Sequence, residues 1–257
     1  MDHYLPGILA NQALAVAAHI LETRFAGAHF AFVAGSIMRG QGTVGSDIDM
    51  VVIYPQLERA WRESLVEEGF PVEAFVHDPA TLDVFLGRDV ENGRPVLINM
   101  VAEGRVVGAQ IEGAAALRAR AAGLLKAGPL PLEGERLDLL LYQVSDLAED
   151  LRGRRNGEEV LAIAVTLYPR LVDLMLWGRG QWSGAGKWLP RRLRAVDAAL
   201  ADQLSSAMAR AAAGDGAAML ALCERALAAR GGALFAGFRR ESDVAGLGAR
   251  FVGNLQS

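Results

Sequence analysis

Short, apolar, β-branched runs are concentrated in the first hundred or so residues, and beyond about residue 110 alanine and leucine at helical spacing take their place. The early runs, bounded by turn residues, predict strands at 29–33, 48–53 and 71–76. Helical patterns at 8–24 and 57–68 accompany them. In the second of these Leu57, Trp61 and Leu65 are expected to share one face, and Gly69 to end the helix. This order of elements predicts a small mixed sheet with helices packed on it.

The remainder of the chain reads as a helical bundle. Glycine and proline breakers separate its apolar patterns, which predict helices at 112–126, 134–152, 158–178, 190–213 and 216–230. Pro169 lies inside one pattern and is expected to kink or split that helix. We therefore predict an α+β protein with a catalytic domain over 1–130 and a helical domain over 131–257.

Composition narrows the classes of partner. The 257 residues carry a formal net charge of −4, which gives no general affinity for nucleic acid or anionic membranes. No uninterrupted apolar run reaches the roughly 18 residues of a membrane span, and the N-terminus lacks the pattern of a signal peptide. The single cysteine, Cys223, fits a reducing compartment. We expect a cytoplasmic protein, without a membrane partner and without a long nucleic-acid partner.

One segment carries the chemistry. Gly35-Ser36 is followed, after ten residues, by Asp47-Ile48-Asp49. Carboxylates two apart at a strand point to the same face, and aspartate is a poor strand former, so the pair needs a functional reason. Close carboxylates repel each other, and the repulsion is relieved either by protonation of one of them or by a bound cation. Magnesium is the expected ion because it takes one or two protein carboxylates and completes its shell with water and phosphates.

Further residues complete such a site. Gly35 lacks a Cβ and lets the backbone approach a phosphate, and a helix starting at Ser36 would present free N–H groups to that anion. Ser46 is expected to bond a phosphate oxygen or to cap the turn. Glu73 stands alone as an acid in the strand at 71–76, with Val72, Ala74 and Val76 turned inward. Three carboxylates holding two metal ions would suit an in-line phosphoryl displacement.

These residues resemble the nucleotidyltransferase superfamily of DNA polymerase beta. Within it, the pattern is most similar to the small bacterial antibiotic nucleotidyltransferases of the kanamycin and streptomycin types and to their uncharacterised relatives. The resemblance covers roughly residues 25–80 by motif. It implies transfer of a nucleoside monophosphate, with ATP as the default donor, to an acceptor hydroxyl on a small molecule such as an aminoglycoside-like compound, with release of pyrophosphate.

The resemblance also implies roles for single residues. Asp47 and Asp49 would bind both magnesium ions, Glu73 would ligate the one beside the attacking oxygen, and Gly35 and Ser36 would hold the triphosphate.

More distant residues receive candidate roles as well. Arg39 is a candidate phosphate contact or a solvated loop residue. Lys187, in the glycine-loosened basic loop at 184–194, is a candidate phosphate clamp, unless this loop is an ordinary helix entry with a solvated basic face. Related enzymes take a general base from the first long helix of the second domain, where Asp146 and Asp150 share a face. Some relatives form dimers with shared sites, so a homodimer is possible.

One motif is rejected, and several other interpretations stay open. The motif Gly40-x-Gly42-x-x-Gly45 matches the dinucleotide fingerprint by letter, but an apolar strand follows it where that fingerprint needs a helix. The alternative interpretation of the acids is purely structural: Asp47 and Asp49 cap turns, and Glu73 is exposed. Modification of a protein or RNA, a largely non-catalytic antitoxin-like role and an Asp-x-Asp glycosyltransferase are the alternative functions.

Overall fold

A computed structural model describes residues 6–43 and 45–241 of the chain, with side chains described from residue 9 onward. Contacts divide the chain into two units. The first comprises the residues up to 131 together with 180–192, and the second comprises 132–179 and the residues from 193. The sequence had placed residues 180–192 with the helical half, whereas their contacts are with the sheet-containing unit.

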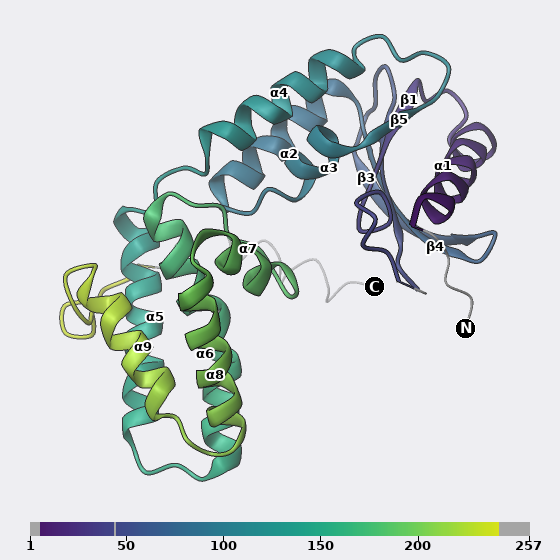
Figure 1. Ribbon diagram of the computed structural model, residues 1–257. Coiled ribbons are helices and arrows are strands. Elements are labelled where there is room, and N and C mark those ends of the chain that lie inside the picture. The colour runs from purple at the N-terminus through teal and green to yellow at the C-terminus, as the bar shows by residue number, and fades with distance from the viewer. Residues whose placement is uncertain (1–5, 44, 242–257) are drawn as a thin grey trace, which may run out of the picture. The chain divides into compact units, whose positions relative to one another are not determined.

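The first unit is built on a mixed five-stranded sheet with the strand order β3-β4-β2-β1-β5 (Figure 1). Its strands are β1 (Phe30–Ala34), β2 (Ile48–Ile53), β3 (Trp61–Glu67), β4 (Phe70–His77) and β5 (Arg105–Val107). Strands β2 and β4 run parallel, and the other pairs are antiparallel. The predicted strands at 29–33, 48–53 and 71–76 are confirmed, and so is the α+β class.

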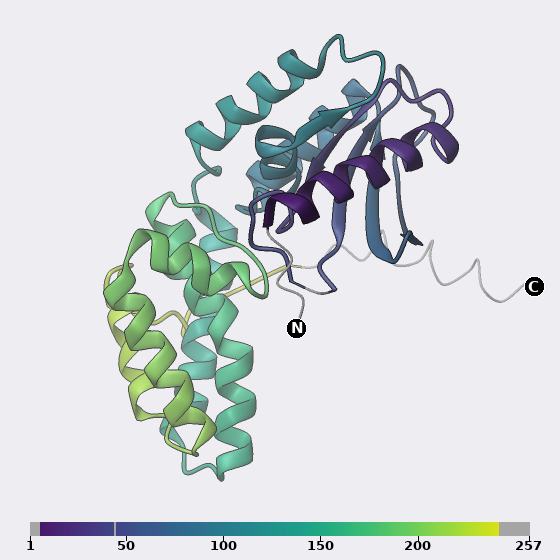
Figure 2. The same cartoon turned by 45° about the vertical axis from the view of Figure 1, so that its right-hand side comes forward.

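Helices cover both faces of this sheet. One face carries α1 (Pro6–Thr23), and the other carries α2 (Pro79–Glu91), α3 (Val96–Glu103) and α4 (Ala114–Ala127) (Figure 1). Figure 2 shows α1 crossing the strands from the side that it covers. The sequence predicted α1 and α4 but assigned no elements to residues 79–107, where α2, α3 and β5 lie.

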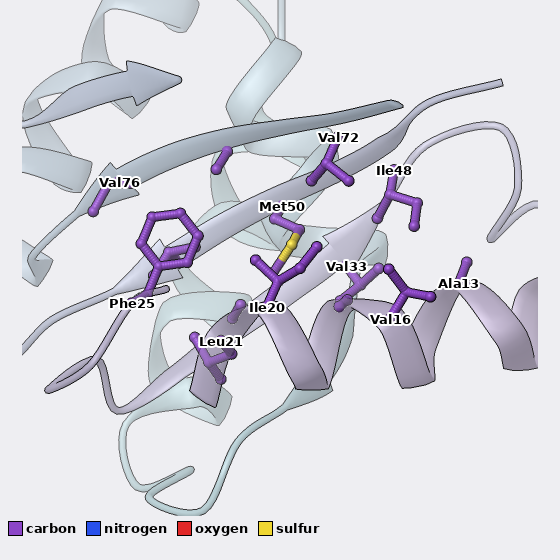
Figure 3. Packing of buried hydrophobic residues seen from close by; sticks show 14 of the residues in the cluster. Ala13, Val16, Ile20, Leu21, Phe25, Val33, Ile48, Met50, Val72 and Val76 are labelled. Atoms are coloured by element: carbon purple, nitrogen blue, oxygen red, sulfur yellow. The ribbon is translucent and has the colours of Figure 1, made fainter. Parts of the chain in front are cut away.

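Strict alternation along the central strands explains the two-sided packing. In β2, Ile48, Met50 and Val52 join the cluster under α1, while Val51 and Ile53 join the cluster under α2 to α4. Figure 3 shows α1 side chains, Val16 and Ile20 among them, packed toward Met50. Because successive side chains of a strand point to opposite faces, Asp49 is placed on the face opposite to α1.

The predicted helix at 57–68 is wrong. Residues 61–67 form the edge strand β3, joined to β4 by the two residues Glu68 and Gly69, both with positive φ (47° and 81°). Two positive-φ residues form the type I′ turn that matches the twist of a hairpin, so Gly69 makes a hairpin turn and does not stop a helix. Trp61 and Leu65, spaced by four, satisfy the periods of a helix and a strand equally well. Only the cross-strand partner β4 decides between them.

The second unit is a helical bundle. Its helices α5 (Gly134–Arg152), α6 (Gly157–Leu176), α8 (Ala198–Ala212) and α9 (Ala217–Ala228) contact one another, α5 with α6 and α9, and α8 with α6 and α9. A 3-10 turn, η1 (Trp177–Arg179), extends α6. The predicted helix at 190–213 is two helices, α7 (Trp188–Val196) and α8, because the Asp197 side chain accepts the Leu200 N–H (2.9 Å) and begins a new helix. Pro169 lies within α6 and does not split it.

Residues 157–179 form the one segment of the described chain that is long and apolar enough to cross a membrane by length and composition. Eight residues of α6 are buried, and the helix contacts α5, α8 and α9. Burial of this kind is what the central helix of a bundle shows, so the segment is weak evidence for a membrane span.

Candidate active site

Three carboxylates meet at one end of the central strands β2 and β4, that is, at the edge of the sheet where β2 begins. Asp47 directly precedes β2, Asp49 lies within it, and Glu73 is the register partner of Asp49 on the parallel strand β4. One carboxylate oxygen from each of the three lies within 4.8 Å of the other two. The structure thus brings together the three acids that the sequence singled out. Oxygen donors this close on two adjacent strands form a set that suits a hard divalent cation such as magnesium.

Gly35 is required by the geometry of this cluster. It follows Ala34, which pairs with Asp49 across the β1–β2 ladder. Its φ is +95°, and a Cβ built on it would lie only 2.6 Å from Oδ2 of Asp49. The glycine therefore leaves room for the carboxylate as well as for any phosphate that approaches its backbone.

The loop after Gly35 is a turn, so the conditional expectation of a helix beginning at Ser36 is wrong. The Gln41 N–H donates to the Ser36 carbonyl (2.9 Å) and the Gly40 N–H to the Ile37 carbonyl (3.0 Å), which closes a single tight loop. Ser46 Oγ accepts the Thr43 N–H (2.8 Å) and the Ser36 hydroxyl (3.2 Å). Of the two roles expected for Ser46, the structure displays the turn cap. Ser36 remains beside the acids, but without a helix dipole behind it.

The electrostatics of the cluster centre on Asp49. Burial, followed by the nearby carboxylates of Asp47 and Glu73, raises the pKa of the Asp49 carboxyl to about 6, with Arg39 and Lys187 acting in the opposite direction. Without a cation, the folded protein therefore disfavours three simultaneous negative charges at this edge. A bound divalent cation would relieve both the burial cost and the repulsion.

The acids open into a pocket of about 320 Å³ that lies entirely within the first unit. This volume is at the lower end of the range for small-molecule sites. The three acids are the only acidic residues in its described lining, and the basic residues of that lining are Arg39, Arg62, Arg94, Lys187 and Arg192. Such a lining suits a ligand that carries several negative charges.

Lys187 reaches this pocket because the loop at 180–192 is tied to the first unit. The Ser183 N–H donates to the Gly93 carbonyl (2.8 Å), and the indole N–H of Trp182 donates to the Leu125 carbonyl (2.8 Å). Among the described residues Lys187 has no hydrogen-bond or ion-pair partner, and its side chain is exposed. It is therefore available to a ligand, and its role as a phosphate clamp stays a prediction.

Arg39 lines the same pocket and belongs to a group of arginines around Trp188. Its guanidinium lies 4.8 Å from the centre of the Trp188 ring and pairs with Glu103 Oε2 at 3.0 Å. Arg191 and Arg192 also lie over this ring, at 5.4 Å and 5.8 Å. Burial lowers the pKa of Arg192, the nearby Arg39 lowers it further, and Glu103 opposes both. An incoming anion would offset this accumulation of positive charge.

Arg62 is a residue of the site that the sequence did not indicate. Its Nη2 lies 2.6 Å from Oε1 of Glu73, and its guanidinium sits 4.8 Å from the centre of the Phe75 ring. The erroneous helix at 57–68 concealed it, because only a strand places Arg62 opposite Phe75. Arg94 and Asn99 also line the pocket and were not indicated by the sequence. Arg192 lines it as well and is one of the arginines of the basic loop that the sequence had indicated.

The candidate general bases lie in the second unit. Asp146 and Asp150 are both on α5; Asp146 is exposed, and Asp150 Oδ1 is paired with Arg155 Nη2 at 2.6 Å. Their assignment as the general base stays a prediction. The ion pair makes Asp150 the less available of the two candidates, because Arg155 already contacts one of its carboxylate oxygens.

Comparison with known proteins adds little at the level of sequence. No family model matches the chain, and no curated protein matches it. A similar solved structure is the nucleotidyltransferase-like protein from Exiguobacterium sibiricum 255-15, with 11% sequence identity and a TM-score of 0.44, covering 84% of this chain and 74% of that one. At that similarity the chemistry of the site has to be judged from its own residues.

Proposed function

We propose that this protein is a metal-dependent nucleotidyltransferase, which transfers a nucleoside monophosphate from a nucleoside triphosphate to a hydroxyl group and releases pyrophosphate. The observation that carries the proposal is the meeting of Asp47, Asp49 and Glu73 at one sheet edge, beside the obligatory glycine Gly35. All other charged residues in the described lining of the adjoining pocket are basic. The resemblance of Gly35-Ser36 and Asp47-x-Asp49 to the nucleotidyltransferase motif supports the same reaction.

The acids fit the metal that this reaction needs. They offer only oxygen ligands, and their ligand atoms lie within 4.8 Å of one another. The raised pKa of Asp49 shows that its negative charge is destabilised, which a bound cation would reverse. We propose that Asp47 and Asp49 hold two magnesium ions, and that Glu73 contributes to the ion on its side. Two such ions, when bound, stabilise the attacking and the leaving oxygens of an in-line displacement.

The remaining residues of the site act on the substrate. The backbone at Gly35 and Ser36 is proposed to contact the triphosphate, whose negative charge is matched by Lys187, Arg39 and Arg192. Contacts with the backbone on one side and with the basic side chains on the other orient the α-phosphorus toward the acceptor. The two reactants then react in a fixed geometry and do not have to meet by a chance encounter.

The step itself forms one bond and breaks one. The acceptor oxygen bonds to the α-phosphorus, and the bond from that phosphorus to the α,β-bridging oxygen breaks, so that pyrophosphate leaves with the electron pair. The hydroxyl proton passes to a general base, for which Asp146 is the first candidate and Asp150 the second.

We propose ATP as the donor and a small hydroxyl-bearing molecule as the acceptor. The net charge of −4 disfavours a long polyanionic acceptor, whose binding depends on many basic contacts. The donor is the default that the motif resemblance implies.

A screen for pyrophosphate release tests the proposal. Each of the four ribonucleoside triphosphates is supplied with Mg²⁺ and a panel of acceptors that includes aminoglycosides, other small polyols, a protein extract and RNA. We expect release with a small-molecule acceptor and loss of release in EDTA. Asp49→Asn should lower turnover by about 1000-fold or more, since metal ions contribute several kcal/mol to such transition states.

The matched control is Asp202→Asn, which removes an exposed aspartate that pairs with Arg194 in the second unit. This variant should keep wild-type turnover. Turnover that persists in Asp49→Asn would overturn the proposal, and binding of a partner protein without any turnover would favour the antitoxin-like role.

A further inference from the structure

The three acids of the site are neutralised to different extents. Glu73 is paired with Arg62 at 2.6 Å. Neither Asp47 nor Asp49 has an ion-pair partner among the described residues, and the charges of Arg39 and Lys187 influence Asp49 only from farther away. In the metal-free protein a cation of the chain itself thus occupies one side of the cluster.

The position of Arg62 is fixed by the β3–β4 hairpin. Arg62 and Phe75 are register partners, and Ser64 pairs with Glu73 in the same way, so all four side chains share one face of the sheet. The Arg62 guanidinium carbon lies over the Phe75 ring, 4.8 Å from the ring centre. The Arg62 side chain is 55% exposed, and its contacts with a ring and a carboxylate on the neighbouring strand define its position.

A guanidinium and a divalent cation oppose each other at one carboxylate. The Arg62 nitrogen occupies Oε1 of Glu73, and a metal ion bound to the same group would be repelled by the adjacent positive charge. Asp47 and Asp49 impose no such competition. The two sides of the cluster should therefore differ in their affinity for metal.

We propose that Arg62 competes with a divalent cation for Glu73, so that the Asp47–Asp49 side of the cluster fills first and the Glu73 side fills only when Arg62 releases this carboxylate. The inference rests on the metal site of the proposed function and assigns to Arg62 control over its second ion. An incoming triphosphate would aid the release, because its negative charge offers the guanidinium another partner. Arg62 acts through Glu73 and is in this sense a positioning residue.

Manganese binding without nucleotide tests the inference directly. Free Mn²⁺ is measured by electron paramagnetic resonance as the full-length protein is titrated. The wild type should bind one Mn²⁺ ion tightly and a second much more weakly. In Arg62→Met, which keeps an apolar chain on Phe75, the second affinity should rise by about 10-fold, because an adjacent positive charge no longer opposes the ion. Arg62→Lys retains the charge, so its second affinity should stay near that of the wild type.

The control is Arg24→Met. Arg24 forms an ion pair at 3.0 Å with Glu63, which lies on β3 as Arg62 does. Arg24 is about as exposed as Arg62, but neither Arg24 nor Glu63 lines the pocket. This variant should bind Mn²⁺ as the wild type does. Thermal unfolding checks that each variant is folded, and Arg62→Gln replaces the methionine variant if that one fails to fold.

The outcomes separate this inference from the proposed function. A second affinity that is unchanged or weakened in Arg62→Met would overturn the competition and leave the metal site standing. Two equally tight ions in the wild type would overturn it as well. A wild-type protein that binds no Mn²⁺ would overturn both the inference and the metal-dependent function.

Discussion

Acidic side chains on the helices of the second unit and at one sheet edge of the first unit are arranged in opposite ways. On the helices of the second unit they pair with nearby arginines at the surface, as in Asp150–Arg155 and Asp202–Arg194. At the sheet edge of the first unit, Asp47, Asp49 and Glu73 lie against one another, and only Glu73 has an ion-pair partner among the described residues.

The difference shows which acids serve the fold and which serve a ligand. Exposed ion pairs contribute little to the stability of a protein, typically between 0 and about 1 kcal/mol, so their residues can be replaced at little cost in stability. Clustered, partly buried carboxylates cost stability, and such costs are retained at sites that bind or react. The first unit accepts this cost at one edge, where a cation and a polyphosphate would remove it.

The largest effect that sharpens this comparison is expected for Gly35→Ala. Its Cβ would lie 2.6 Å from Oδ2 of Asp49, so the carboxylate must move away from its place in the cluster. A displacement of this size can lower turnover by about 100-fold. The control Gly113→Ala has a similar left-handed φ of +87° but open space around the new methyl group, so it should share the backbone strain and keep its activity. Steady-state kinetics compares the two, and equal losses would contradict the role given to Gly35.

A second effect concerns the stability of the metal-free protein. The folded-state pKa of Asp49 is about 6, above its ordinary value near 3.8. Between pH 4 and 6 the folded state therefore binds more protons than the unfolded state, and the wild type loses stability as the pH rises through this window. Asp49→Asn lacks this loss. We take the difference in free energy of unfolding between the variant and the wild type at pH 4 as the reference. Above pH 6 this difference should have shifted by about 2 kcal/mol in favour of the variant.

Urea unfolding in EDTA across this pH range measures the difference. The gain in stability accompanies a loss of activity, as expected of a residue kept for function. Stability curves of the two proteins that run parallel from pH 4 to 8 would show that burial and repulsion at Asp49 have no energetic consequence.

The smallest effect is expected in the second unit. Asp202→Asn removes one partner of an exposed pair in which both side chains are more than half exposed. Its free energy of unfolding should change by less than about 0.5 kcal/mol, and the change should vanish at high salt. A loss of several kcal/mol would remove the contrast between the two units.

The sequence predicted the centre of the site better than its surroundings. Strands β1, β2 and β4 are short apolar runs bounded by turn residues, and they place Asp49 and Glu73 without reference to distant contacts. Arg62 could not be found, since the spacing of Trp61 and Leu65 fits a helix as well as a strand, and only pairing with β4 distinguishes the two. The expected helix at Ser36 failed for a related reason, because the bonds of Ser46 across the loop, one of them to Ser36, are invisible in a linear pattern.

The basic loop shows a different limit. Its residues stand in the helical half of the sequence, yet the bonds of Ser183 and Trp182 attach it to the first unit. Neither bond leaves a periodic signal. Composition changes near residue 131, but it cannot reveal that a later loop returns to the sheet-containing unit.

Anomalous X-ray diffraction from crystals soaked with Mn²⁺ and a triphosphate analogue that cannot be cleaved between its α- and β-phosphates tests the central claim most directly. We expect manganese bonded to carboxylate oxygens of Asp47 and Asp49, a second ion at Glu73, and the triphosphate against Gly35 and Ser36. A triphosphate bound elsewhere, with no manganese at these three acids, would contradict it.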